Sequence, residues 1–259
     1  MNESGKCAII TGGAQGIGKA TTRRLLDAGW AVTIADIDEE AGRETADEFR
    51  DRGPLYFAPT DVADEGQVRQ VIADTAARFG GIDLLMNNAY QSLPWVSIEN
   101  YSLEQWNRAL SVNLTSAFLT TKYAVPHLRA RRGCIVNISS ILALRTYPNT
   151  VAYSSGKGAL AALTHALAVS LGPEIRVNCI SPGMIDTSGW VKSTRHRRKG
   201  YPEEIHRMHP AGRIGVPEDI AAVVAFLVSS DADFITGQNF VIDGGVLRVM
   251  RAFPSDEMT

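Results

Sequence analysis

The stretch Cys7-Ala8-Ile9-Ile10-Thr11-Gly12-Gly13-Ala14-Gln15-Gly16-Ile17-Gly18 decides the fold of this chain. Its short apolar run leads directly into a glycine loop, and a helical pattern follows. Strand, loop and helix in this order form the setting of a dinucleotide site, because a helix N-terminus offers free N–H groups to phosphates. Gly12 allows the tight turn, Gly16 admits a pyrophosphate and Gly18 permits close helix packing. Many turns are rich in glycine, so the loop alone leaves a plain turn open.

The next predicted strand, residues 31–35, strengthens the dinucleotide interpretation. It ends in Asp36, close to the ~20 residues beyond the glycines where a ribose-binding acid is expected. A carboxylate there accepts hydrogen bonds from ribose hydroxyls and repels a 2′-phosphate. Ile37 follows, and the loop from Thr11 to Gly18 has no Lys or Arg to receive a phosphate. The sequence therefore predicts NAD rather than NADP, unless Asp36 is merely a solvated acid at a strand end.

Helical and extended patterns then alternate along the whole chain. The predicted helices span 38–50, 64–79, 101–131 with a break, 151–171 and 217–229; the predicted strands span 55–58, 82–86, 134–138, 176–180 and 239–242. Such alternation favours an α/β fold with a doubly wound parallel sheet and helices on both faces. No linker rich in Pro, Gly or Ser divides the chain, so we expect a single domain over residues 1–259.

Polar residues follow successive predicted strands, at Asp61-Val62, Asn87-Asn88-Ala89, Ser139-Ser140 and Pro182-Gly183. Turn chemistry alone often puts such residues at strand ends. In a parallel sheet, however, these ends meet at the edge where ligands bind. We therefore expect these residues to lie near the glycine loop.

The segment Val151-Ala152-Tyr153-Ser154-Ser155-Gly156-Lys157 places a tyrosine and a lysine one helical turn apart on one face. A free phenol ionises near pH ~10, so its ionisation at pH 7 costs about 4 kcal/mol. A neighbouring ammonium group lowers this cost, which would make Tyr153 a base near neutral pH. The alternative is two unrelated residues on an exposed helix face.

Composition excludes several classes of function. The formal net charge of the 259 residues is −2, which gives no general field for nucleic acid. No apolar run approaches the ~20 residues of a membrane span, and the start lacks a signal peptide's core, so we predict a soluble cytoplasmic protein. Cys7, Cys134 and Cys179 lie in apolar strand-like runs and suit buried reduced thiols. Neither they nor the five histidines have the spacing of a metal site.

Together these motifs resemble the short-chain dehydrogenase/reductase family over almost the whole chain. The resemblance rests on Thr11-Gly12-x3-Gly16-x-Gly18, Asn87-Asn88-Ala89, Ser140 thirteen residues before Tyr153, Tyr153-x3-Lys157 and Pro182-Gly183. It implies a single-domain extended Rossmann fold, a homotetramer and a catalytic tetrad of Asn113, Ser140, Tyr153 and Lys157. Tyr153 would exchange the alcohol proton while hydride moves to or from the nicotinamide, and Ser140 would steady the substrate oxygen. Lys157 would keep the phenol acidic and bind the nicotinamide ribose, and Asn113 would hold a water that links Lys157 to solvent.

The resemblance also assigns the cofactor contacts. The predicted contacts are Gly12, Gln15, Gly16, Ile17, Gly18, Asp36, Ile37, Asp61, Val62, Asn88, Ala89, Tyr153, Lys157, Pro182, Gly183, Ile185 and Thr187. Within this set Asp61 and Val62 would bind the adenine, and Ile185 and Thr187 the nicotinamide amide. One position departs from the family: Tyr90 stands where a glycine or another small residue is usual.

Substrate choice is predicted to lie in a lid segment, residues 187–215. It contains a basic run, namely Lys192, Arg195, His196, Arg197, Arg198 and Lys199. Such a run is usually a solvated face, but Arg195, Arg197 and Arg198 could bind an anionic substrate, and the patch could also dock a carrier protein. The flat side chains of Tyr90, Trp95 and Trp190 suit a sugar ring.

We therefore predict an NAD-dependent oxidoreductase that acts on a secondary alcohol or ketone, such as a sugar or sugar acid. Two alternatives stay open. The first is an NADPH-dependent 3-oxoacyl-carrier-protein reductase, against which Asp36 argues. The second is a dinucleotide-binding protein without catalysis, against which Tyr153 and Lys157 argue, because a pure binding module has no use for the pair.

Overall fold

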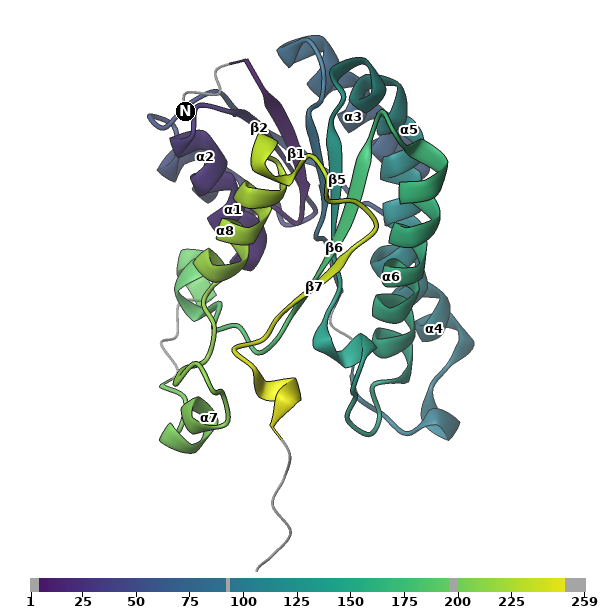
Figure 1. Ribbon diagram of the computed structural model, residues 1–259, viewed down its shortest axis with the longest axis vertical. Helices are drawn as coiled ribbons and strands as arrows, with labels where there is room; N and C mark the ends of the chain where they lie inside the picture. The colour runs from purple at the N-terminus through teal and green to yellow at the C-terminus, as the bar shows by residue number, and fades with distance from the viewer. Residues whose placement is uncertain (1–4, 92–93, 196–199, 250–259) are drawn as a thin grey trace, which may run out of the picture.

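A computed structural model of the chain describes residues 5–91, 94–195 and 200–249 (Figure 1). Its strands are β1 Cys7–Thr11, β2 Ala31–Asp36, β3 Leu55–Pro59, β4 Leu84–Asn87, β5 Cys134–Ile138, β6 Arg176–Pro182 and β7 Asn239–Ile242. Its α-helices are α1 Gly16–Asp27, α2 Glu39–Glu48, α3 Glu65–Phe79, α4 Leu103–Leu110, α5 Ser116–Arg131, α6 Val151–Leu171, α7 Glu203–Arg207 and α8 Pro217–Leu227.

The seven strands form one parallel sheet in the order β3-β2-β1-β4-β5-β6-β7. The chain runs outward from β1 to β3, and then crosses back so that β4 pairs with the other side of β1. This reversal creates the switch point of a doubly wound sheet, where a crevice opens beyond the carboxyl ends of the strands. The predicted fold is confirmed.

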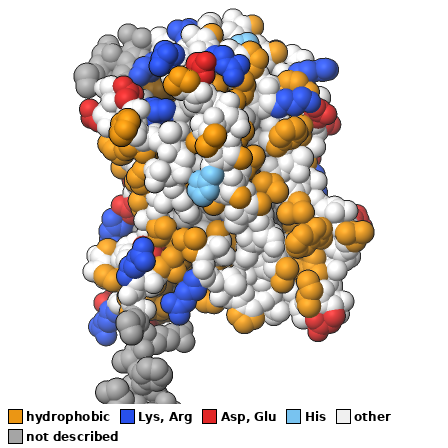
Figure 2. Space-filling view, turned by 45° about the vertical axis from the view of Figure 1, so that its right-hand side comes forward, with side chains coloured by type: hydrophobic (Ala, Val, Ile, Leu, Met, Phe, Trp, Pro, Cys, Tyr) orange, Lys and Arg blue, Asp and Glu red, His pale blue; other side chains and the backbone are white. Residues whose placement is uncertain are grey.

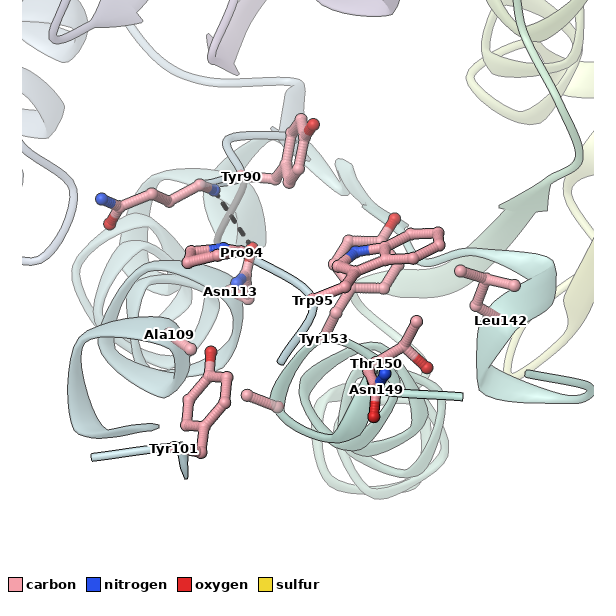
Figure 3. A pocket seen from close by; sticks show the side chains of 12 residues that line it. Tyr90, Pro94, Trp95, Tyr101, Ala109, Asn113, Leu142, Asn149, Thr150 and Tyr153 are labelled. Atoms are coloured by element: carbon pink, nitrogen blue, oxygen red, sulfur yellow. Dashed lines mark hydrogen bonds between the residues drawn. The ribbon is translucent and has the colours of Figure 1, made fainter. Parts of the chain in front are cut away.

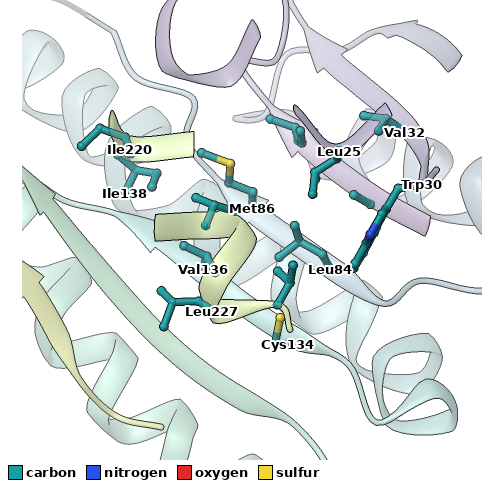
Figure 4. Packing of buried hydrophobic residues seen from close by; sticks show 14 of the residues in the cluster. Leu25, Trp30, Val32, Leu84, Met86, Cys134, Val136, Ile138, Ile220 and Leu227 are labelled. Atoms are coloured by element: carbon teal, nitrogen blue, oxygen red, sulfur yellow. The ribbon is translucent and has the colours of Figure 1, made fainter. Parts of the chain in front are cut away.

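Alternation along the strands builds two cores, because successive side chains point to opposite faces of a sheet. On one face, β-strand residues such as Ala8 and Val136 pack with Leu25 of α1 and Leu227 of α8 (Figure 4). On the other face, Ile9, Leu85 and Ile135 pack with side chains of α3, α5 and α6. Both faces of the sheet are thus covered by helices, as Figure 1 shows.

The helix starts are encoded locally. Asp38 and Asp64 cap α2 and α3, and each side chain accepts a hydrogen bond from the backbone N–H three residues on. Both residues were predicted as the first of their helices and stand just outside. Ser102 and Gln105 form a capping box at α4, so the long predicted helix begins at Leu103.

The break expected within residues 101–131 is a π-helical turn, Ser111–Thr115, between α4 and α5. The extra residue of such a turn widens the helix locally, and π-turns are frequent at functional sites. Asn113 lies in the middle of this turn and its side chain is buried. The irregularity therefore belongs to the part of the chain that the sequence marked as catalytic.

Candidate active site

The glycine loop is pinned to the end of β4 by a compact set of hydrogen bonds. Asn88 donates its side-chain amide to the carbonyls of Thr11 and Gly12, both at 3.0 Å. The Thr11 hydroxyl accepts the backbone N–H groups of Asn88 and Ala89, again at 3.0 Å. Gly12 has φ +62°, and a Cβ there would lie 2.9 Å from the Ala89 Cα. Glycine is therefore required by both conformation and space.

A large cleft of about 590 Å³ opens at this edge of the sheet. Of the predicted cofactor residues, it is lined by Gly12, Gln15, Gly16, Ile17, Asp36, Ile37, Asp61, Val62, Asn88, Ala89 and Thr187. Its volume lies within the ~300–1,000 Å³ typical of ligand sites. The N-terminus of α1 and the positive φ of Gly16, +57°, leave backbone N–H groups free to face a pyrophosphate. These residues fit a nicotinamide dinucleotide.

Asp36 stands at the end of β2 and joins the glycine loop to the start of α2. One carboxylate oxygen accepts the N–H of Ala14 and the other that of Asp38, each at 3.0 Å. Burial raises the pKa of Asp36, against the effect of these backbone hydrogen bonds. Each oxygen retains a lone pair that can accept a further hydrogen bond from the cleft. Asp36 is thus both a structural anchor and a candidate partner for ribose hydroxyls.

Five predicted cofactor contacts, apart from Tyr153, are not among the described residues that line the cleft. Gly18 and Gly183 are positions of close packing, where a Cβ would lie 2.1 Å from the Gly12 oxygen and 2.7 Å from the Asp243 Cα respectively. Pro182 ends β6, and Ile185 pairs with Gly215 and packs against the core. Lys157 is buried beneath the site.

The buried ammonium of Lys157 donates a 2.7 Å hydrogen bond to the carbonyl of Ile138, at the end of β5. The backbone carbonyl of Lys157 accepts one from the Ser139 hydroxyl, also at 2.7 Å. Helix α6 is thereby fixed to β5 at the level of Ser140. Burial lowers the pKa of Lys157 to about 8, so the group is still mostly charged at neutral pH.

Tyr153 does not have the lowered pKa that the sequence predicted. Burial raises the pKa of its phenol, a hydrogen bond with Ser140 partly offsets this, and Tyr90 adds to the rise. Lys157 Nζ lies 5.9 Å from the centre of the Tyr153 ring and donates to Ile138 instead. The expected lowering by the ammonium is therefore not found, desolvation dominates, and the phenol carries its proton at neutral pH.

A second and smaller pocket of about 170 Å³ lies beside the cleft (Figure 3). Its lining residues are Tyr90, Gln91, Pro94, Trp95, Tyr101, Ala109, Asn113, Leu142, Asn149, Thr150, Ala152 and Tyr153. Figure 3 shows Asn113 and Tyr153 approaching it from two different helices. The Trp95 ring stacks on Tyr147, with their centres 6.2 Å apart. Of the predicted tetrad, Asn113 and Tyr153 thus line this pocket, and Ser140 and Lys157 support it from the end of β5 and from α6.

Tyr90, whose role the sequence left open, stands at the junction of the two cavities and lines both. Its ring meets that of Tyr153 edge-on, with centres 6.0 Å apart and planes at 79°. The Lys157 ammonium lies 6.0 Å from the Tyr90 ring centre. Tyr90 is 56% exposed. The Tyr90 ring therefore lies beside Tyr153 and Lys157, two of the predicted catalytic residues.

The lid segment differs from its prediction. The Arg23 guanidinium lies over the Trp190 ring, with its central carbon 4.4 Å from the ring centre. Trp190 also packs against the core, away from the smaller pocket. Lys192 Nζ lies 3.1 Å from the carboxylate of Asp38 and also pairs with Glu40. Arg195 lines the large cleft rather than the substrate side. These contacts do not support a substrate role for Trp190 or Arg195, and His196, Arg197, Arg198 and Lys199 lie outside the described residues.

Sequence reasoning missed several lining residues. Arg108 and Gln91 line the cleft, and Tyr101 and Asn149 line the pocket. Asn149 has a positive φ, +66°, which this residue type tolerates better than most. Its position just before a predicted helix was a weak signal of a turn. Arg108 had no signal, because it reads as an ordinary cation on an amphipathic helix.

Comparison with known proteins agrees with this geometry. Residues 12–247 match the family described as enoyl-(acyl carrier protein) reductase. An uncharacterized oxidoreductase of Thermotoga maritima is 45% identical over 93% of this chain and 96% of its own length. L-fucose dehydrogenase of Mus musculus is 38% identical over 93% of this chain and 88% of its own. A mutant short-chain dehydrogenase/reductase from Serratia marcescens superposes with a TM-score of 0.85 at 31% identity, covering 95% of this chain and 99% of that one.

The parallel sheet, the pinned glycine loop and the cleft at the switch point define a Rossmann-type oxidoreductase that binds a nicotinamide dinucleotide. The chain belongs to the short-chain dehydrogenase/reductase family. Among the residues that the structure describes, no helix is long and apolar enough to cross a membrane. The cysteines at positions 7, 134 and 179 are free and buried, as predicted.

Proposed function

We propose that this chain is an NAD-dependent dehydrogenase that oxidises a secondary alcohol of a small neutral sugar, or reduces the matching carbonyl. The observation that carries the proposal is the pairing of Ser140 and Tyr153 above the buried Lys157, where the cleft meets the smaller pocket. A pure binding module has no use for a buried, charged lysine at this place, because burying it opposes folding. Catalysis supplies a reason for that cost.

A nicotinamide dinucleotide held in the cleft supplies or accepts the hydride. In reduction, the protonated phenol of Tyr153 donates its proton to the substrate oxygen; in oxidation, the phenol first loses its proton to solvent, and the phenolate then accepts the proton of the substrate hydroxyl. The Ser140 hydroxyl donates a hydrogen bond to the same oxygen as charge develops on it. Lys157, charged at neutral pH, stabilises the phenolate that remains after Tyr153 has given up its proton. Asn113 helps to shape the pocket from the π-helical turn.

The smaller pocket favours a neutral sugar over a sugar acid. Among the described residues that line it, none is Asp, Glu, Lys, Arg or His. A carboxylate placed there would lose its water without gaining a cation, which is costly. Instead, Trp95 and Tyr101 offer flat apolar faces, and Gln91 and Asn149 offer amide groups for hydroxyls. The likeness to L-fucose dehydrogenase supports the same substrate class.

A panel of sugars assayed for NADH formation tests this proposal. The panel pairs neutral sugars, L-fucose and D-galactose among them, with acids of matched size such as D-galacturonate, each with NAD and NADP. We expect turnover of neutral sugars with NAD. Turnover restricted to the acids would contradict the neutral substrate class.

A reductase of carrier-bound 3-oxoacyl groups is the second candidate, because the matching family description names an acyl carrier protein. Two observations weigh against it. Asp36 lines the cleft, where its carboxylate would repel the 2′-phosphate of NADPH, and Lys192, which the sequence offered as part of a carrier dock, is already paired with Asp38 and Glu40. NADPH oxidation with a 3-oxoacyl thioester, exceeding the turnover of every sugar, would favour this candidate.

We also propose the homotetramer that the sequence suggested. Phe118 on α5 and Val169 on α6 are 52% and 85% exposed, and Phe234 near β7 is fully exposed. Figure 2 shows hydrophobic side chains over the middle of one face, with charged ones mainly above and below. Such faces bury one another in symmetric oligomers. Light scattering should give about four times the 28.0 kDa chain mass, and the chain mass itself at micromolar concentration would exclude the tetramer.

A further inference from the structure

The loop that follows β4 carries Tyr90 and Gln91 and forms part of both cavities. Up to Ala89 it is held by the Thr11 hydroxyl. Gln91 is then held twice: its backbone N–H donates to Asn113 Oδ1 at 3.3 Å, and its side-chain oxygen accepts from Arg108 Nε at 3.0 Å. The first of these hydrogen bonds is the dashed line in Figure 3.

Arg108 also reaches in the opposite direction. Its Nη2 donates to Asp61 Oδ2 at 3.1 Å, and both residues line the large cleft. Three hydrogen bonds thus connect Asp61, on the cleft, with Asn113, on the smaller pocket, through Arg108 and Gln91. Of the four residues joined by these hydrogen bonds, Gln91 is the one that lines both cavities.

We propose that Arg108 is a positioning residue that couples the dinucleotide cleft to the substrate pocket. A ligand that contacts Asp61 and Arg108 would restrain the guanidinium, which would in turn hold Gln91 and set Tyr90 and Asn113 in place beside Tyr153. This inference rests on the proposed function in so far as the cleft binds a nicotinamide dinucleotide. It adds a residue and a coupling that the tetrad does not contain.

The chemistry of the arginine suits this role. A guanidinium presents several N–H donors in a rigid planar fork, so it can hold a carboxylate and an amide oxygen at fixed angles to each other. A lysine has a single charged nitrogen on a flexible stem and would favour one of the two partners. The side chains of Arg108 and Asp61 are 40% and 27% exposed, and such pairs contribute little to global stability. A loss of coupling can therefore be observed in a protein that remains folded.

Hydrogen exchange with and without bound cofactor tests the coupling directly and needs no substrate. The variants are Arg108→Met, Arg108→Lys and Gln91→Leu, with Arg50→Met as the matched control. Arg50 is another arginine paired with an aspartate, Asp47, on the exposed end of α2. NADH and NADPH binding is first followed by nicotinamide fluorescence. Exchange of the Tyr90, Gln91 and Trp95 amides is then measured by NMR or fragment mass spectrometry at saturation.

In the wild type and in Arg50→Met, saturating cofactor should slow exchange of these amides by about tenfold, the effect of one well-formed hydrogen bond. In Arg108→Met and Gln91→Leu the slowing should fall below about threefold although cofactor still binds, and Arg108→Lys should not restore it. Equal slowing in Arg108→Met and the wild type would overturn the coupling and leave the proposed function intact. If neither dinucleotide binds the wild type, the proposed function fails, and the inference fails with it.

Discussion

The predicted catalytic corner, formed by Ser140, Tyr153 and Lys157, and the predicted lid segment, residues 187–215, use their charged residues in opposite ways. In the corner, Lys157 is buried, has its pKa lowered to about 8, and donates to a backbone carbonyl. In the lid, Lys192 has its pKa raised by hydrogen bonds with Glu40 and Asp38, and holds the segment against α2. This contrast supports the catalytic role that we propose for Lys157 and a structural role for Lys192.

The burial of Lys157 is tested most sharply by the free energy of unfolding. We expect Lys157→Met to remove a cost that the wild type pays at neutral pH. Because the pKa of Lys157 is about 8 in the folded state and 10.5 in its ordinary state, the unfolded chain binds more protons between these values. Wild-type stability at this group therefore rises with pH through that window, by about 3 kcal/mol.

Urea unfolding at pH 7.5 and pH 10 measures this effect. The wild type should gain about 2 kcal/mol relative to Lys157→Met between the two pH values, which span most of the titration window, since methionine does not titrate. If the unfolding free energies of the wild type and Lys157→Met differ by the same amount at both pH values, Lys157 is not desolvated in the way that the structure indicates.

Asp36 should give the next largest effect, on cofactor choice. Asp36→Asn keeps the shape of the side chain and one oxygen acceptor but removes the charge that repels a 2′-phosphate. The ratio of kcat/KM for NADP to that for NAD should rise by about tenfold to a hundredfold, the range of a charge-assisted hydrogen bond. Asp27→Asn, which alters an exposed acid paired with Arg52, is the control. A ratio unchanged in Asp36→Asn would make this residue a structural anchor alone.

A substitution in the predicted lid segment should have the smallest effect on kinetics. Because Arg195 lines the cleft near Asp38, Arg195→Met should raise KM for the dinucleotide by no more than about fivefold and leave KM for sugars unchanged. Steady-state kinetics with one neutral and one acidic sugar measures both. A rise in KM confined to the acidic sugar would restore the anion site that the basic run suggested.

The sequence predicts features that depend on local patterns, and it fails for features that depend on contacts between distant segments. The alternation of strands and helices and the spacing of Tyr153 and Lys157 are local patterns, and both appear in the structure as expected. The pKa of Tyr153 depends on how much of the ring other elements cover, which no local pattern contains. The partners of Lys192 lie more than 150 residues away, so its basic run resembled an anion site when read alone. Arg108 escaped notice for the same reason, since its partners lie on two distant loops.

The most direct test of the account is the turnover of Tyr153→Phe with a neutral sugar and NAD, beside Tyr123→Phe as a control. Tyr123 bonds to Glu65 on the surface, so it loses a hydroxyl far from both cavities. We expect Tyr153→Phe to lose about 10²–10⁴-fold in kcat, while its NADH dissociation constant changes less than about threefold. Turnover of Tyr153→Phe within tenfold of the wild type would contradict the assignment of Tyr153 as the proton donor and acceptor.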